Sequence, residues 1–168
     1  QYWEKISRSI DDNTGEELLT ESVISVYFSE NNNWLWTGTE DGIAISDDNG
    51  ISWIVHRFWE KTEFNNSEKM LSAYPNPFLI NDYNQIGGDG HVRFIYSNPN
   101  DQLGSIDIFD FTMDRVTQLT YTYLVDNYES EIIWNGRNEY GKKVANGVYF
   151  CRLSLNGEYY WTKLAVIN

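Results

Sequence analysis

The segment at residues 134–153 limits the fold of this chain more than any other stretch of its sequence. A tryptophan precedes two glycines in Asn-Gly and Tyr-Gly pairs, which permit the positive φ angles of tight turns. After a third glycine the side chains alternate with a period of two, as in a half-buried strand. The positions that carry this pattern are Trp134, Gly136, Gly141, Gly147 and Tyr149. The segment predicts the closing hairpin of a small β-sandwich without catalytic residues, and hence a structural or addressing module.

Composition favours an all-β protein. Aromatic residues make up 16% and apolar residues 41% of the 168 residues, which is enough for a core and typical of strands. No segment sustains an apolar period of 3.6 residues beyond two turns, so we expect no long helix. No apolar run reaches the roughly 18 residues of a membrane-spanning helix, so we expect a chain that does not span a membrane.

Charge and the metal-binding residue types exclude several classes of function. The net charge of −13 argues against a nucleic-acid partner, because such a surface needs basic residues. The single cysteine, Cys151, cannot form an intrachain disulfide, and we expect a buried, unreactive thiol. The two histidines, His56 and His91, fall in different predicted domains and do not suggest a zinc site. The loop at 81–90 fits a solvated loop better than a calcium site, so no metal and no cofactor are expected.

The first third of the chain contains short apolar runs separated by turn-rich connections. Four strand candidates within about 36 residues match the size of one propeller blade. These candidates lie at residues 22–28, 33–37, 42–46 and 52–57. Residues 2–6 fit the last strand of a preceding blade. We therefore predict that residues 1–57 end a β-propeller, with one four-stranded blade at about 20–57.

A polar stretch at residues 58–69 is the predicted linker to a second domain. Beyond it, Pro75 and Pro77 flank Asn76 in a segment that fits a sheet edge, because proline cannot donate to the strand ladder. Further strand candidates follow at 91–97, 104–110, 115–123, 130–134, 147–155 and 158–167. This number of short strands predicts an antiparallel β-sandwich over residues 70–168.

From Ser46 to Trp53 the sequence follows the pattern Ser-x-Asp-x-Gly-x-Ser-Trp. Asp48 can accept backbone N–H groups within the turn, Gly50 can take the left-handed conformation, and Trp53 can pack back over the hairpin. Together with Trp-Thr-Gly-Thr-Glu-Asp-Gly at 36–42, this stretch resembles the Asp-box blade of the sialidase-like repeat families. In those families the Asp-box is a folding device away from the active site, so the resemblance implies a structural role for these residues.

Four motifs occur in a fixed order over residues 70–168. They are YPNPF at 74–78, IDIFDF at 106–111, the segment from Trp134 to Phe150, and TKLAVI at 162–167. They resemble the Ig-like domain of flagellar hook-capping proteins, and still more the C-terminal sorting domains of the type IX (Por) secretion system. Many relatives have a glycine where this chain has Met113, which suggests a different turn geometry here.

The resemblance implies that this domain is a targeting signal, an address that directs the protein to its destination. Domains of that family are recognised at the outer membrane, drawn through a translocon and often cleaved, and the cargo is released or attached to surface lipopolysaccharide. The chain is thus expected to be the non-catalytic C-terminal portion of a secreted or cell-surface bacterial protein. Its expected partners are the secretion translocon or the surface-anchoring machinery, and also other protein subunits or upstream propeller blades.

Two other functions stay open. An extracellular structural or assembly component would use the sandwich and the blade for protein–protein contacts. The C-terminal part of a propeller glycoside hydrolase would have its active site upstream. Tyr159, Tyr160 and Trp161 run consecutively, so at least one must face outward and could bind a carbohydrate or a partner domain. Trp34 and Trp36 fit burial against neighbouring blades equally well.

Overall fold

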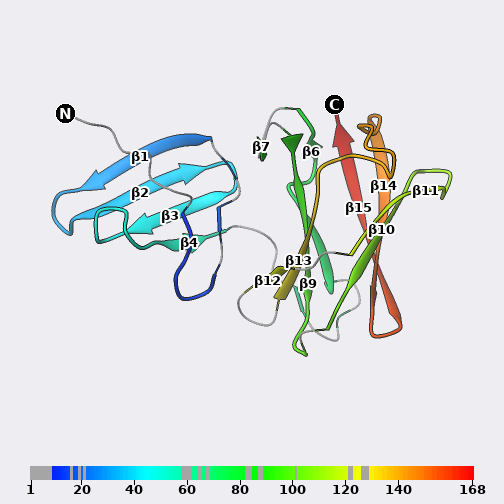
Figure 1. Cartoon of the computed structure of the whole chain (residues 1–168), viewed down its shortest axis with the longest axis horizontal. Coiled ribbons are helices and arrows are strands. Elements are labelled where there is room, and N and C mark those ends of the chain that lie inside the picture. Colours follow the sequence, from blue (N-terminus) through cyan, green and yellow to red (C-terminus); the bar gives the residue numbers. More distant parts are fainter. Residues whose placement is uncertain are drawn as a thin grey trace. The chain divides into compact units, whose positions relative to one another are not determined.

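The protein is built from β-strands. The computed structural model describes residues 9–15, 17–18, 20, 22–57, 62–63, 66, 69–81, 85–86, 89–100, 102–120, 123–125 and 129–168. These residues contain no helix, and their strands form several sheets with mainly antiparallel pairing, so the predicted all-β class is confirmed. The chain divides into two compact units (Figure 1). The first comprises Gln1–Phe58 with Asn84–Ile86, and the second comprises Trp59–Tyr83 with Gly87–Asn168.

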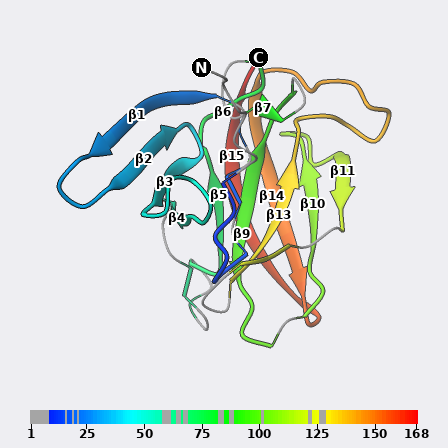
Figure 2. The same ribbon diagram turned by 60° about the vertical axis from the view of Figure 1, so that its left-hand side comes forward.

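The first unit is built around one four-stranded antiparallel sheet whose strands lie in sequence order (Figure 2). Its strands are β1 (Val23–Ser29), β2 (Trp34–Thr39), β3 (Gly42–Ser46) and β4 (Ile54–His56). The four predicted strands are therefore confirmed. None of them joins the sheet that contains residues 147–167, so the N-terminal meander is a sheet of its own.

Burial is uneven across this sheet. The small core consists of Leu18, Ala44, Trp53 and Val55, with Leu35 packed against it. On β1, by contrast, apolar side chains of both faces are between 46% and 68% exposed, namely Val23, Ile24, Val26, Tyr27 and Phe28. β1 pairs only with β2 among the described strands. A single sheet needs a second layer to cover its apolar faces, so β1 offers a surface that another element could cover.

The second unit contains two sheets. The five-stranded sheet has the order β11-β10-β14-β15-β6, and the four-stranded sheet has the order β12-β13-β9-β5. The strands of the first are β6 (Phe78–Leu79), β10 (Ser105–Phe109), β11 (Arg115–Leu119), β14 (Gly147–Leu155) and β15 (Glu158–Ile167). Those of the second are β5 (Leu71–Tyr74), β9 (Val92–Ser97), β12 (Tyr123–Val125) and β13 (Glu129–Trp134). Between β6 and β9 along the chain lie two short strands: β7 (Gln85–Ile86), which belongs to the first unit, and β8 (Asp89–Gly90), which belongs to the second.

Both sheets of the second unit contribute to one hydrophobic core. The four-stranded sheet supplies Leu71, Val92, Phe94, Tyr96, Ile132 and Trp134, and the five-stranded sheet supplies Phe78, Ile106, Ile108, Tyr149, Cys151, Leu153, Leu155, Leu164 and Val166. Alternate residues of β14 are buried, which confirms the period of two read from the sequence. Cys151 is fully buried, as predicted, and burial raises the pKa of its thiol to about 12. The thiol therefore stays protonated and unreactive at neutral pH.

The predicted strand at 115–123 is wrong as a single element. β11 ends at Leu119, whereas Tyr123–Val125 forms β12 and pairs with β13 in the other sheet. The physical reason is the length of the partner strand. Leu119 pairs with Ile106, and β10 begins at Ser105, so β10 does not extend far enough to pair with the residues after Leu119. The chain therefore leaves the five-stranded sheet and joins the four-stranded one.

The proline segment also changes sheets. β5 is the edge strand of the four-stranded sheet, and β6 is the edge strand of the five-stranded sheet, where it pairs in parallel with the end of β15. Pro75 and Pro77, both preceded by cis peptide bonds, lie between β5 and β6. The prediction of a proline-bearing edge strand is therefore confirmed only for the sheet edge: the strands on both sides are edge strands, but the two prolines lie in the bend between them.

Candidate functional site

The turn at the Asp-box motif is closed by side chains. One carboxylate oxygen of Asp48, Oδ1, accepts the backbone N–H groups of Ile51 at 3.0 Å and of Ser52 at 2.9 Å. The other oxygen, Oδ2, accepts the Ser52 hydroxyl at 2.6 Å. Ser46 donates its hydroxyl to Asp48 at 2.8 Å and accepts the N–H of Gly50, also at 2.8 Å. Gly50 has a φ angle of 88°, so the predicted left-handed glycine and the predicted acceptor role of Asp48 are confirmed.

Trp53 connects this turn to the core of the first unit. Its side chain is buried beside Ala44 and Val55. The adjoining polar loop is fixed by Asp11, whose carboxylate accepts the N–H of Val55 at 3.0 Å and that of Asn13 at 2.9 Å. The carboxylates of Asp48 and Asp11 thus satisfy backbone N–H groups of the turn and the loop.

These hydrogen bonds predict a pH dependence of the Asp-box turn. The bonds from the Ser52 hydroxyl and backbone, followed by that from Ser46, hold the pKa of Asp48 well below its ordinary value of 3.8. Because the folded-state pKa is depressed, the stabilisation is fully present above about pH 4 and decreases as the pH falls below that value. We expect the amide protection factors of Ile51 and Ser52 to fall on acidification in the native protein.

The matched variants are Asp48→Asn and Asp47→Asn. The first should remove this acid dependence, because an amide does not titrate, whereas the second alters an exposed neighbour and should leave it unchanged. Hydrogen exchange between about pH 2 and pH 5 measures both, because the stabilisation is lost below about pH 4. The same acid dependence in Asp48→Asn and in the native protein would contradict this account.

In the second unit, the motif residues meet in one aromatic cluster. Trp134, which is 1% exposed, has its ring centroid 6.1 Å from that of Phe78 and 6.0 Å from that of Tyr149. Its indole N–H donates to the carbonyl of Arg137 at 2.8 Å. The Tyr149 hydroxyl donates to the carbonyl of Ala145, also at 2.8 Å. The cluster therefore joins β6, the end of β13, the following turn and β14.

The three motif glycines have different roles. Gly136 has a φ angle of 72°, and a Cβ at this position would lie 2.8 Å from the Ile80 side chain and 3.0 Å from the Phe78 ring. Gly141 has a φ angle of 74°, but no atom lies within 4 Å of the position its Cβ would take. Both predicted turn glycines are confirmed. Gly147 begins β14 without a positive φ angle.

Asn76 ties the proline segment to β15. Its side-chain amide donates to the carbonyl of Lys163 at 2.9 Å, and its amide oxygen accepts the N–H of Ala165 at 3.1 Å. Immediately beyond, Val166 pairs with Phe78 of β6. The asparagine side chain thus continues the edge pairing of β15 where the two prolines cannot contribute N–H donors.

Sequence reasoning did not identify the polar contacts at the end of β15. The backbone N–H of Asn168 donates to Asn146 at 2.6 Å, and the Asn168 side chain accepts a hydrogen bond from Asn81. Lys143 in turn donates to Asn81 at 2.8 Å. Because each of these hydrogen bonds joins residues at least 22 positions apart and exposed asparagines are common, only the folded arrangement identifies these contacts.

Met113 occupies the position where a glycine was expected from the resemblance. It has a φ angle of 65°, in the left-handed region that favours glycine. The methionine thus adopts a backbone conformation that glycine takes readily, and the expected difference in turn geometry from the relatives stays a prediction. The turn is held by Asp110, whose Oδ1 accepts the N–H of Thr112 at 2.9 Å and of Asp114 at 3.1 Å.

Met113→Gly should stabilise the second unit by about 0.5–1 kcal/mol. The left-handed conformation costs a side-chain-bearing residue about 1–2 kcal/mol, and the greater unfolded-state entropy of glycine offsets part of the gain. Asn156→Gly is the matched control, because Asn156 has a similar φ angle of 53° and asparagine tolerates this region better. Thermal unfolding should show a larger rise in Tm for Met113→Gly, and an equal or smaller rise than in the control would contradict the account.

The remaining sequence predictions concern metals and segments at the margins. Among the residues that the structure describes, no three His, Cys, Asp or Glu side chains group as metal ligands. The strand predicted at 2–6 and the loop residues Asp82 and Asn84 lie outside the described residues, as does most of the predicted linker at 58–69. No helix in the described part of the chain is long and apolar enough to cross a membrane. Comparison with protein families, curated proteins and solved structures gives no match for this chain.

Proposed function

We propose that residues 70–168 form an Ig-like β-sandwich that acts as a type IX-like sorting and cell-surface anchoring domain, without catalytic activity. In this proposal the first unit is an Asp-box blade of the β-propeller kind. The partners would be the secretion translocon or the surface-anchoring machinery of a bacterium, and the protein would act outside the cell.

The observation that carries this proposal is the convergence of the motif residues beside β15. Phe78, Trp134 and Tyr149 share one aromatic cluster, and Gly136 packs against it. Asn76 binds the backbone of β15 directly. Motifs that are separate in sequence therefore specify one local structure, which is what a receptor needs in order to read an address independently of the cargo.

A second feature supports the same role. Among the residues that the structure describes, the core of the second unit includes none from the first unit, where Leu18, Ala44, Trp53 and Val55 form a separate cluster. A sorting domain has to fold in the same way on different cargo, and a separate core meets that requirement.

Deletion of residues 70–168 tests whether this domain is necessary. In a bacterium with a type IX system, we expect the deleted protein to accumulate in the periplasm while the intact protein reaches the surface. Gly141→Ala is the control, since the open surroundings of Gly141 should let the domain fold. Unchanged surface display after the deletion would contradict the proposal.

A second candidate function, an extracellular assembly component, rests on β1. Its apolar side chains are exposed on both faces, and its outer edge pairs with no described strand. Such a strand could add to the sheet of a partner. This candidate predicts that the second unit stays on the mature protein, whereas sorting followed by cleavage predicts its loss. The intact mass of the surface form distinguishes the two.

A further inference from the structure

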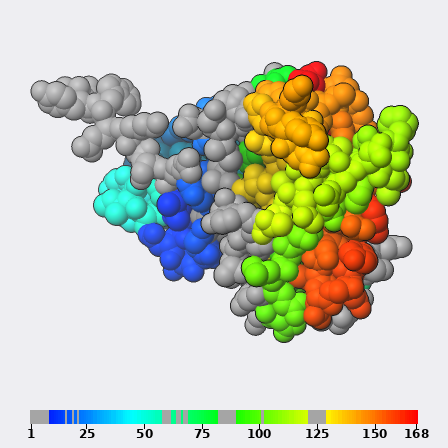
Figure 3. Space-filling view, turned by 45° about the vertical axis from the view of Figure 1, so that its right-hand side comes forward, coloured from blue at the N-terminus to red at the C-terminus, as the bar shows by residue number. Residues whose placement is uncertain are grey.

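The outer face of the five-stranded sheet carries a cluster of aromatic and basic side chains. The strand register places Phe109 opposite Phe150 and Phe150 opposite Lys163, and it pairs Arg152 with Trp161. The intervening residues of β14 point into the core. We call the outward cluster the aromatic platform, and it consists of Phe109, Phe150, Arg152, Tyr159, Trp161 and Lys163. In Figure 3 the yellow-green residues around β10 and β11 adjoin the orange and red residues of the β14–β15 hairpin on one face of this unit.

Three of the four rings of the platform are held in place by one guanidinium group. The Cζ atom of Arg152 lies 4.7 Å from the centroid of the Tyr159 ring, 5.2 Å from that of Phe109 and 5.6 Å from that of Trp161. Arg152 also donates to the buried carboxylate of Asp107 at 2.8 Å. This arrangement orders the rings before any ligand arrives, which lowers the entropic cost of binding.

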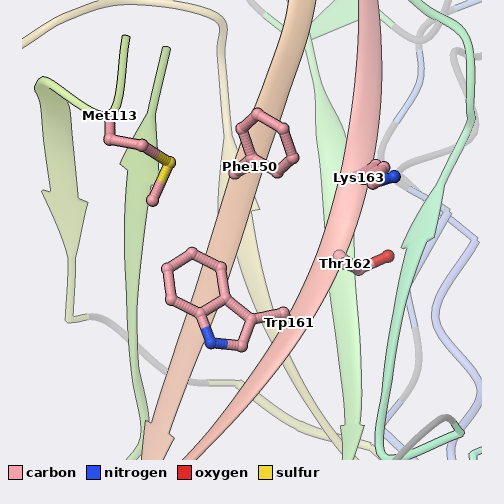
Figure 4. Close-up of a pocket in the computed structure, with 5 residues that line it drawn as sticks. All are labelled: Met113, Phe150, Trp161, Thr162 and Lys163. Atoms are coloured by element: carbon pink, nitrogen blue, oxygen red, sulfur yellow. The ribbon is translucent and has the colours of Figure 1, made fainter. Parts of the chain in front are cut away.

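The platform adjoins a groove with a volume of about 330 Å³. The groove is lined by Met113, Phe150, Trp161, Thr162 and Lys163 (Figure 4). In this view the rings of Phe150 and Trp161 lie next to each other on β14 and β15, and the Met113 thioether approaches from the turn after β10. Trp161 is 46% exposed and Tyr159 is 59% exposed, so both rings remain available to a ligand. The volume lies in the range of small-molecule sites.

The chemistry of the platform excludes several occupants. β10 and β14 each have a hydrogen-bonded strand on both sides, so a peptide cannot add as a further strand there. The charges of the platform and its turn balance in number. Arg115 and Arg152 both pair with Asp107, Lys163 lies over the Phe150 ring, and Asp110 and Asp114 hold the turn after β10. Such a surface exerts no net attraction on an anionic membrane or a polyanion.

A sugar combines the two properties that this surface matches. The ring of a hexose has an apolar C–H face that stacks on an exposed aromatic ring, and its hydroxyls donate to carboxylates and accept from ammonium groups. We propose that the aromatic platform binds a neutral oligosaccharide, with one sugar ring stacked on Trp161 and a second contact at Tyr159. Lys163 supplies hydrogen bonds at the groove. This site is independent of the sorting function, so failure of either proposal leaves the other standing.

Titration of the full chain with neutral glucose hexasaccharides tests the site. The probes are cellohexaose, laminarihexaose and maltohexaose, with hexagalacturonate as the charged comparison, followed by calorimetry and tryptophan fluorescence. We expect at least one neutral probe to bind with a Kd of about 0.01–1 mM. Trp161→Ala should weaken that binding about ten-fold or more, Tyr159→Ala should weaken it less, and Trp161→Phe should restore part of it. Trp34→Ala, at an exposed tryptophan of the first unit, should have no effect.

Three outcomes would overturn the proposal. The first is that none of the neutral hexasaccharides binds, and the second is that hexagalacturonate binds more tightly than all of them. The third is that Trp161→Ala, shown to be folded by circular dichroism, binds as well as the native chain. If Trp161→Ala instead dissociates a dimer of a native chain that binds no sugar, the platform is an interface between two copies.

Discussion

Trp134→Ala should lower the free energy of unfolding of the second unit by about 3–5 kcal/mol, the largest effect expected of any single substitution considered. The indole is almost fully buried and contacts both Phe78 and Tyr149, so its removal leaves a cavity between the two sheets. It also removes the donor that satisfies the Arg137 carbonyl. Urea denaturation followed by near-ultraviolet circular dichroism measures the loss.

Trp161→Ala is the matched control for this substitution, because it removes the same side chain from an exposed position on β15. We expect it to cost less than about 1 kcal/mol. Equal losses in the two variants would show that Trp134 does not organise the core. If both variants lose little free energy of unfolding, that result would also contradict the account, because it would show that the buried Trp134 indole does not stabilise the second unit.

Gly136→Ala should destabilise the second unit by about 2–4 kcal/mol. The left-handed backbone costs an alanine about 1–2 kcal/mol, and the added Cβ must displace the Ile80 side chain and the Phe78 ring, which adds a cost of overpacking. The measurement is again denaturation by urea, with hydrogen exchange of the β14 amides to locate the change.

Gly141→Ala isolates the contribution of packing. Gly141 has nearly the same φ angle, 74° against 72°, but has no neighbour within 4 Å. The control should therefore lose only the backbone contribution of about 1–2 kcal/mol. If Gly136→Ala and Gly141→Ala lower the free energy of unfolding by the same amount, the contact between the turn and the proline segment does not stabilise the fold.

Local sequence signals predicted most of the strands, because they depend on neighbouring residues alone. The alternation around Tyr149 and the left-handed requirement at Gly50, Gly136 and Gly141 are properties of short segments, and the structure confirms them. The division of the predicted strand at 115–123 could not be read locally, because it depends on where β10 ends.

The contacts that join distant segments could not be predicted from the sequence. The hydrogen bonds of Asn76 to β15 and the stacking of Arg152 among three rings connect residues on different strands, so neither periodicity nor composition contains them. For residues 159–161, the alternation of side chains along a strand predicted only that at least one of the three aromatic rings faces outward. The register then showed that Tyr159 and Trp161 are the outward pair, while Tyr160 packs against the core.

The central claim is that the second unit is sufficient as a surface address. The most direct measurement is to fuse residues 59–168 to the C-terminus of a fluorescent protein that carries its own export signal, in a bacterium with a type IX system. Accessibility of the reporter to added protease in intact cells reports its position. We predict that the reporter reaches the surface or the medium, and that the same fusion with Trp134→Ala does not. A reporter that stays in the periplasm with the native domain would contradict the claim.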